Sequence, residues 1–317
     1  MEVLVTGGSG FIGTRLVEVL LEQQHEVKIF DKRPSETYPD LVTIGDVRDK
    51  DALIEACIGM DIIYNLAAEH ADNVRPISLY TDVNVGGAEN VVAAAQANDI
   101  KRMVFTSTVA IYGRHQINPD ESFEAQPSSE YGITKYEAEK IFVKWAEQDP
   151  ECSLTIVRPA VVFGERNIGN VRRLMEQIAT KKFVIVGSGK NEKSMGYVGN
   201  ISLLLASKAT AEPSIDIYNF AGKPDLSTER IVDIITDELK ISHKFPHVPE
   251  WAVLIVGYMF DMLSRITGKK FPISSVRIKK FTADTIVSTD KLLKSGFVEK
   301  FDLEEGLRRT IRYEFKK

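Results

Sequence analysis

The chain has 317 residues, which is enough for one large domain or two unequal ones. Its composition is that of an ordinary globular protein, and a formal net charge of -5 argues against bulk nucleic-acid binding. The two cysteines, Cys57 and Cys152, have no Cys or His at metal-ligand spacing, so we expect reduced cysteines and no metal site.

Short, β-branched apolar runs alternate with helical patterns from residue 2 to about residue 160. Strands that are buried on both faces, with helices between them, indicate a doubly wound parallel sheet of the Rossmann type, an α/β fold with right-handed crossovers. The expected strands are 3–5, 27–30, 41–44, 62–65, 103–106 and 154–157. The expected helices are 11–21, 50–56, 78–97 and 131–147.

The alternation changes in the second half of the chain. A basic helix at 170–182 and a short strand at 183–186 come first, and a strand at 215–220 is expected to rejoin the main sheet. The last third is mostly helical. The predicted parts are an NAD-binding domain at 1–165, rejoined by 198–222, and a smaller, mostly helical substrate-binding lobe at 166–197 and 223–317.

A glycine-rich turn links the first strand to the first helix. Gly7, Gly10 and Gly13 give a G-x-x-G-x-x-G spacing, which permits a tight turn and close approach of the backbone to a pyrophosphate. The free N–H groups at the start of the helix favour that anion. The second strand ends in Asp31, near the position expected of a ribose-binding carboxylate, and its charge favours NAD over NADP. Further expected cofactor contacts are Ser9, Phe11, Ile12, Lys32, Asp46, Val47, Leu66, Ala67, Ala68 and Thr106.

Tyr131 and Lys135 are the main chemical signal. They stand four residues apart on a predicted helix and therefore share one face. A free tyrosine is a poor base at neutral pH, but a nearby ammonium and an oxidised nicotinamide ring both favour the phenolate. We therefore expect Tyr131 to act as general base and acid on a substrate hydroxyl, at the edge of the sheet where ligands bind. Thr108, after the fifth strand, is expected to hydrogen-bond the reacting oxygen, with Ser107 as its competitor.

With these motifs the sequence resembles a known family, the extended short-chain dehydrogenases/reductases, or NAD-dependent sugar epimerases/dehydratases. The resemblance is carried by the glycine turn, S-T-x-x-x-Y-G at 107–113, Y-G-x-x-K at 131–135 and Arg158-Pro159, and it extends to L-E-E-G-L at 303–307. It implies a catalytic triad of Thr108, Tyr131 and Lys135. It also implies cofactor contacts at Asn84, Tyr131, Lys135, Pro159 and Val161.

The residues after Thr108 bear on the reaction. Dehydrating members of the family carry an Asp–Glu pair there, and decarboxylating members carry a glutamate two places after the threonine. This sequence has Val109 and Ala110, which cannot act as acid or base, so both reactions are disfavoured. Reversible oxidation at one carbon remains, either in an epimerase that returns the hydride or in a net dehydrogenase or reductase.

Several segments are similar to bacterial 4-epimerases of N-acetylglucosaminyl-diphospho-undecaprenol, which act in O-antigen and lipopolysaccharide assembly. These segments are 68–70, 78–85, 164–167, 193–200, 266–270 and 274–277. The pattern that UDP-sugar 4-epimerases carry at 193–200 is replaced by Lys193, Ser194, Tyr197 and Asn200, which disfavours uridine recognition. The expected substrate contacts are Glu69, His70, Ser107, Thr108, Arg166, Asn167, Lys193 and Arg277.

One physical feature fits a lipid-linked substrate. The apolar run 251–260 is too short to span a bilayer, but a basic segment follows it, a combination suited to an interfacial membrane contact. A buried helix of the substrate lobe with a solvated loop is the other reading. No signal peptide pattern is visible, so we expect a cytoplasmic protein, peripheral at the inner face of the membrane if the first reading holds.

Four functions stay open on this evidence. The first is 4-epimerisation of N-acetylglucosamine on undecaprenyl diphosphate, and the second is the same chemistry on UDP-N-acetylglucosamine or UDP-glucose. The third is a net NAD-dependent dehydrogenase or reductase, and the fourth is an NAD-sensing protein without catalysis, which the intact Tyr131 and Lys135 disfavour. By analogy with the family we expect a homodimer, formed through helices 78–97 and 131–147.

Overall fold

The computed structural model describes residues 1–71, 74–113, 117–268, 271 and 274–316, without the side chains of residues 277, 280 and 281. They form two compact units. Unit 1 consists of Met1–Val162, Gly196–Ala221 and Val287–Phe301. Unit 2 consists of Phe163–Met195, Gly222–Ile286 and Asp302–Lys317.

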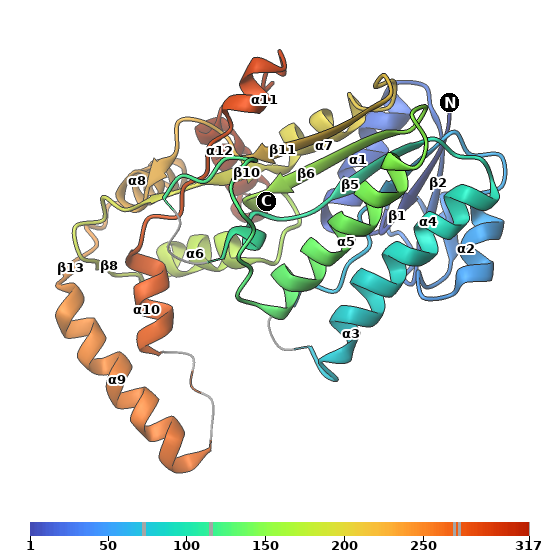
Figure 1. Ribbon diagram of the computed structural model, residues 1–317. Coiled ribbons are helices and arrows are strands. Elements are labelled where there is room, and N and C mark those ends of the chain that lie inside the picture. Colours follow the sequence, from blue (N-terminus) through green and yellow to red (C-terminus); the bar gives the residue numbers. More distant parts are fainter. Residues whose placement is uncertain (72–73, 114–116, 269–270, 272–273, 317) are drawn as a thin grey trace. The chain divides into compact units, whose positions relative to one another are not determined.

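A seven-stranded sheet lies at the centre of unit 1 (Figure 1). Its order is β11-β6-β5-β4-β1-β2-β3, and every pair of neighbours is parallel, which confirms the predicted α/β fold. The strand expected to rejoin the sheet does so as β11, at the edge beside β6. The strands are β1 (Glu2–Thr6), β2 (Glu26–Asp31), β3 (Val42–Ile44), β4 (Ile62–Asn65), β5 (Arg102–Thr106), β6 (Ser153–Pro159) and β11 (Ser214–Phe220).

Helices cover both faces of this sheet. Alternate strand residues enter two separate cores: Leu4, Ile63 and Phe105 pack with α2, α4 and α5, whereas Val5 and Tyr64 pack with α1 and α7. This alternation explains why the strands are apolar throughout. The helices are α1 (Phe11–Glu22), α2 (Lys50–Ala56), α3 (Ser78–Tyr80), α4 (Gly87–Ala97), α5 (Glu130–Glu147), α7 (Val198–Ala206) and α11 (Asp290–Lys294), with short turns η1 (Pro39–Leu41), η2 (Thr81–Gly86) and η3 (Val109–Tyr112).

The order in which strands are added to the sheet changes sides between β1 and β4: β2 and β3 follow on one side of β1, and β4, β5, β6 and β11 follow on the other. The strand order therefore switches between β1 and β4. Ligands of open α/β sheets bind at such a point. The glycine turn after β1 and residues 66–70 after β4 both lie there.

Unit 2 is mostly helical. Helices α8 and α12 are joined through Glu238, whose carboxylate accepts hydrogen bonds from Lys316, Arg312 and Arg308. Those bonds, that of Lys316 first, lower the pKa of Glu238 to about 2. Within the described residues, no helix combines the length and the apolar character that crossing a bilayer requires. The elements are α6 (Asn170–Ala179), β8 (Ile185–Val186), β9 (Glu192–Lys193), β12 (Leu226–Ser227), α8 (Thr228–Leu239), β13 (His247–Val248), α9 (Glu250–Thr267), α10 (Ser275–Thr282) and α12 (Leu303–Phe315), with β7 (Val161–Phe163) and β10 (Met195–Tyr197) at the unit boundaries.

Candidate active site

The turn between β1 and α1 leaves no room for a side chain at Gly7 or Gly13. Gly7 has φ +74°, and a Cβ there would lie 2.7 Å from the backbone nitrogen of Ala67. A Cβ on Gly13 would contact the Gly7 carbonyl oxygen and lie 2.7 Å from the Gly8 Cα. Helix α1 begins after Gly10 without a side-chain cap. Its first N–H groups are therefore available to an anion, because no side chain caps them.

Asp31 connects this turn to the end of β2. Its carboxylate accepts hydrogen bonds from the backbone nitrogens of Ser9, at 3.1 Å, and Arg33, at 3.0 Å. Asp31 is buried. Lys32 beside it is exposed and lies 3.7 Å from the Glu69 carboxylate. The turn and the acid thus form one structure, as a ribose-binding carboxylate next to a pyrophosphate site requires.

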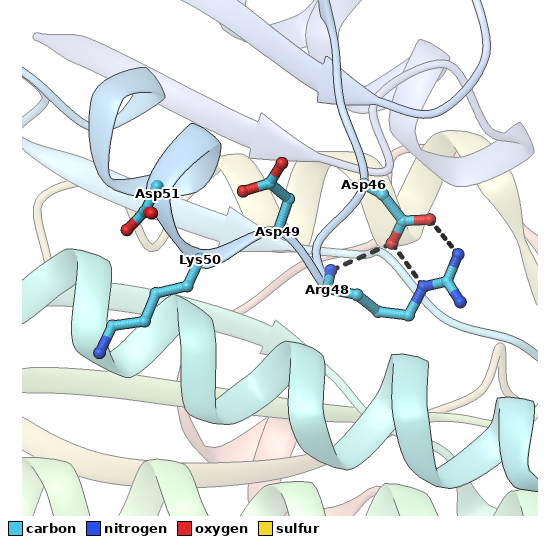
Figure 2. A pocket seen from close by; sticks show the side chains of 5 residues that line it. All are labelled: Asp46, Arg48, Asp49, Lys50 and Asp51. Carbon is cyan, nitrogen blue, oxygen red and sulfur yellow. Dashed lines mark hydrogen bonds and ion pairs between the residues drawn. The ribbon is translucent and has the colours of Figure 1, made fainter.

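Asp46, which follows β3, is bound to Arg48. Its carboxylate accepts from the Arg48 backbone nitrogen and guanidinium, and these hydrogen bonds lower its pKa (Figure 2). The open hollow beside it is lined by charged residues, Asp46, Arg48, Asp49, Lys50 and Asp51, and the catalytic candidates do not border it. Val47 is buried in the core. A contact with the adenine at this edge would therefore be made chiefly by backbone atoms.

Helix α5 carries the catalytic candidates. The Ser129 side chain caps it by accepting a hydrogen bond from the Gly132 nitrogen at 3.1 Å. Tyr131 lies in the first turn and is half-buried, and Lys135 follows one turn later and is only 2% exposed. The ammonium of Lys135 lies 4.0 Å from the centre of the Phe105 ring, on β5. Sequence reasoning did not identify Phe105 as its partner, because a cation–π contact across a helix and a strand leaves no spacing signal.

Both titratable groups are shifted by burial. Desolvation raises the pKa of Tyr131 to about 12, although its hydrogen bond to the Thr108 side chain acts in the opposite direction. Desolvation lowers the pKa of Lys135 to about 7, against the raising effect of the Glu139 charge. A phenol and an amine at one site with pKa values displaced in this way are typical of acid–base machinery.

The loop after β5 presents hydroxyl groups to the same place. The Ser107 nitrogen donates to the Val157 carbonyl at 2.7 Å, and Thr108 caps η3 by accepting from the Ala110 nitrogen. The side-chain oxygens of Thr106 and Ser107 are buried and have no hydrogen-bond partner in the described part of the chain. Buried hydroxyls without partners are costly, so these oxygens point to a ligand.

Close packing brings that loop to α5. A Cβ on Gly132 would lie 2.8 Å from the Ala110 carbonyl oxygen, so the helix approaches η3 more closely than any other residue would allow. This approach places Tyr131 within reach of Thr108. Thr108 and Tyr131, two residues of the triad that the resemblance implied, are thus brought together within unit 1, and Lys135 follows one turn later on α5.

Asn84 joins helix α5 to the residues that follow β4. Its amide oxygen accepts from the Glu69 nitrogen at 2.8 Å, and its amide nitrogen donates to the Glu69 carbonyl and the Thr134 hydroxyl, both at 3.0 Å. Asn84 lies in the π-helical turn η2, which interrupts the helix expected at 78–97. Such turns are frequent at functional sites. Asn84, which the resemblance implies as a cofactor contact, therefore holds Glu69 and Thr134 in place through its side chain.

A buried ion pair lies behind Lys135. Glu139, four residues further along α5, accepts two hydrogen bonds from Arg158 at 3.0 and 2.7 Å, and Arg158 also donates to the Tyr112 hydroxyl. Burial lowers the pKa of Arg158, but Glu139 outweighs this and the net change is upward. The i, i+4 spacing of Lys135 and Glu139 is visible in the sequence, but it does not identify Arg158 as the partner. The pair fixes the strand end that continues into Pro159.

The other predicted contacts are spread over both units. In unit 1, Leu66, Ala67 and Ala68 follow β4, His70 is exposed, and Val161 is about half exposed. In unit 2, the Arg166 side chain donates to the Tyr313 hydroxyl at 3.0 Å, and Lys193 donates to the Ala283 carbonyl.

The remaining predicted residues have these placements. Phe11 and Ile12 open α1, Pro159 ends β6, and Asn167 precedes α6, with its side chain accepting from the Gly169 nitrogen. The side chain of Arg277 lies outside the described residues.

The residues present fit NAD. The tight turn at Gly7 and Gly13 and the uncapped start of α1 match the pyrophosphate of a dinucleotide, and the Asp31 carboxylate matches a ribose. The hydroxyls of Thr106 and Ser107, which have no hydrogen-bond partner in the described part of the chain, match the nicotinamide end. Together they lie along the carboxyl ends of β1, β2 and β5.

The Gly13→Ala variant tests this assignment. The added Cβ meets backbone atoms that cannot turn away, so the turn must open. We expect the Kd for NAD to rise at least about tenfold, since an opened turn aligns its N–H groups poorly. Calorimetric titration measures this. Gly86→Ala is the control, because its nearest atom would lie 3.9 Å away; equal losses in the two variants would contradict the assignment.

Comparisons with known proteins identify the family of the chain. Residues 3–220 match the model of the NAD dependent epimerase/dehydratase family. The chain is 47% identical, over 99% of its length and 95% of the relative's, to N-acetyl-alpha-D-glucosaminyl-diphospho-ditrans,octacis-undecaprenol 4-epimerase of Escherichia coli O157:H7. It is 31% identical, over 98% of both chains, to 2-alkyl-3-oxoalkanoate reductase of Stenotrophomonas maltophilia. The fold of UDP-glucose 4-epimerase from Thermotoga maritima, solved with UDP-glucose, matches with a TM-score of 0.79 at 22% identity, covering 100% of this chain and 99% of that one.

Proposed function

Because the chain belongs to the NAD-dependent epimerase/dehydratase family, we propose that it is a 4-epimerase that interconverts N-acetylglucosamine and N-acetylgalactosamine on undecaprenyl diphosphate. The observation that carries the proposal is 47% identity over 99% of the chain with an enzyme of that name, together with a complete Thr108, Tyr131 and Lys135 set. The identity with a reductase at 31% keeps a net oxidoreductase as the second candidate.

The residues of unit 1 supply the acid–base part of the reaction. Tyr131 takes the proton of the sugar hydroxyl as it is oxidised and gives it back when the ketone is reduced. Lys135 supplies positive charge on the same helix face, which favours the phenolate. Thr108, bonded to Tyr131, holds the reacting oxygen in line. Bound NAD would supply the hydride acceptor and donor at C4.

The loop after β5 supports epimerisation over elimination. Val109 and Ala110 form the start of η3, in the places where dehydrating and decarboxylating relatives carry acids. Neither side chain can move a proton. A keto intermediate formed here would therefore meet Tyr131 as its acid, and the reaction that remains is return of the hydride to one face or the other.

The residues that replace the UDP-sugar pattern support a carrier other than uridine. In unit 2, the Ser194 hydroxyl donates to Asp225 at 2.6 Å, and Lys193 is bound to the Ala283 carbonyl. In unit 1, Asn200 holds the backbone of Phe301 by two hydrogen bonds, of 2.6 and 3.2 Å. These side chains are engaged within the protein, which leaves them poorly placed to read a base. We assign unit 2 the role of substrate lobe.

The carrier is tested by offering two substrates in parallel. N-acetylglucosaminyl-diphospho-undecaprenol in detergent and UDP-N-acetylglucosamine are each incubated with the protein, and the released sugar is analysed for N-acetylgalactosamine. We expect kcat/KM for the lipid-linked sugar to be at least about a hundredfold higher than for the nucleotide sugar. A site built for one carrier discriminates against another by about that factor. Preferential conversion of the nucleotide sugar would overturn the proposed carrier, and accumulation of NADH would favour the net oxidoreductase.

We also propose that the enzyme acts as a homodimer at the inner face of the cytoplasmic membrane, where a polyprenyl carrier resides. The dimer rests on analogy with the family, in which the faces of α4 and α5 pair, and on the exposed Ile133 of α5. Sedimentation velocity at assay concentration should give twice the 35.4 kDa of one chain. A single species of one chain's mass would refute the dimer.

A further inference from the structure

Helix α9 of unit 2 carries a continuous apolar stripe that faces away from its neighbour. Eight large apolar side chains of this helix are exposed. Six of them recur at helical spacing and share an arc of about 100° around the axis. The stripe consists of Trp251, Ile255, Tyr258, Met259, Met262 and Ile266, each more than half exposed.

The opposite side of α9 is fixed against α10. Gly257 is buried at the crossing, where a Cβ would lie 2.6 Å from the Ile278 side chain. The Asp261 carboxylate accepts from the Ser275 hydroxyl at 2.5 Å, and Glu250 accepts from Thr282 at 2.8 Å. Both acidic residues of the helix are therefore turned to α10, which leaves the stripe without negative charge and defines its orientation.

The charge around the stripe is positive. Between Asp261 and Asp284 the sequence contains no acidic residue, against a net charge of -5 for the whole chain. Arg265 is exposed in the last turn of α9, and the Lys279 ammonium lies 5.7 Å from the ring centre of Tyr258, so cations flank the apolar surface. The basic residues of this segment are Arg265, Lys269, Lys270, Arg277, Lys279 and Lys280.

We propose that α9 lies flat in the headgroup region of an anionic bilayer, with the stripe inserted among the acyl chains and with Arg265 and Lys279 on the phosphates. An apolar helical face beside clustered Lys and Arg, with Trp and Tyr in it, is the composition of interfacial helices. Its 18 residues span about 27 Å along the surface. The inference rests on the proposed function, since a polyprenyl-linked sugar must be reached at the membrane.

Vesicle binding tests the proposal, with Trp251 as an intrinsic probe. Trp251 is 67% exposed and Trp145 only 4%, so a shift in tryptophan emission on binding reports Trp251. We expect a blue shift and co-sedimentation with vesicles of phosphatidylglycerol and phosphatidylethanolamine. Binding to vesicles of phosphatidylcholine should be weaker by about tenfold, and added salt should weaken the anionic case. Trp251→Phe should abolish the shift and keep binding.

Two double variants complete the test. Met259→Gln with Ile266→Gln should weaken vesicle binding about tenfold while the far-UV spectrum is kept. Leu293→Gln with Val298→Gln, at exposed positions of unit 1, should have no effect. Equal binding by both double variants, or loss of self-association rather than of vesicle binding in the first, would overturn the proposal. Vesicle binding without conversion of the lipid-linked sugar would refute only the proposed carrier, and conversion in detergent without vesicle binding would refute only the role of α9.

Discussion

Tyr131→Phe is expected to lower kcat for epimerisation by about 10²–10⁴-fold and to leave the Kd for NAD within about a factor of two, because a general acid–base contributes that much and the ring itself is kept. The Tyr131 side chain is half-buried and is hydrogen-bonded to the Thr108 side chain. Conversion of the sugar is followed by product analysis, and NAD binding by calorimetric titration.

Tyr136→Phe is the matched control on the same helix. Tyr136 lies five residues further along α5 and is half-buried, with the Lys140 ammonium 4.9 Å from its ring centre. Loss of its hydroxyl should leave kcat within about a factor of two, because residues five apart on a helix do not share a face. Equal turnover by Tyr131→Phe and the wild type would remove Tyr131 from the mechanism, whereas NAD binding without turnover by either protein would favour an NAD-sensing protein.

The pH profile sharpens this prediction. Burial raises the pKa of Tyr131 to about 12, so the phenolate is scarce at neutral pH until positive charge is near. An ammonium at Lys135 is such a charge, and desolvation lowers its pKa to about 7. The pH profile of kcat should therefore respond to the charge of Lys135 as well as to that of Tyr131.

Periodicity in the sequence predicted most of unit 1. The six strands and four helices expected before residue 160 are present, because strands buried on both faces leave an unambiguous apolar signal. The helix expected at 78–97 is broken by the π-helical turn at Thr81–Gly86, since a change of hydrogen-bond register leaves no trace in polarity. Segment 287–301 lies in unit 1 although it was placed in the substrate lobe, because only its contacts in three dimensions, not its composition, assign it.

Sequence spacing predicted some residues of the candidate site and missed others, because only some of their contacts follow from spacing. Gly7, Tyr131 and Lys135 were identified because fixed spacing on one turn or one helix brings them together. Phe105 and the pair of Glu139 with Arg158 were missed, since a ring beneath an ammonium and an ion pair across α5 and β6 depend on how the elements pack. The roles of the substrate residues stay predictions.

Lys135→Met should separate the catalytic role of this lysine from its cost to the fold. We expect kcat to fall about 10²–10⁴-fold, because the positive charge that favours the phenolate is removed. At the same time the variant should unfold at a higher temperature than the wild type in the absence of NAD. A buried ammonium is expensive, and the unbranched Met side chain occupies similar space over the Phe105 ring. Glu139 keeps its partner, since Arg158 holds it by two hydrogen bonds.

The sign of the pH dependence follows from the lowered pKa of Lys135. The folded pKa is about 7 and the ordinary value is 10.5, so between these values the unfolded chain binds a proton that the folded protein does not. The free energy of unfolding of the wild type therefore rises with pH between about 7 and 10.5 because of Lys135. Below pH 7 the buried ammonium destabilises the folded protein to its full extent. The Tm advantage of Lys135→Met should be at least about 2 °C at pH 6 and should shrink toward pH 10. Lys140→Met, at an exposed position of the same helix, should show neither effect. An advantage that is constant across pH would show that folding does not shift the pKa of Lys135, and would contradict the desolvation of its ammonium.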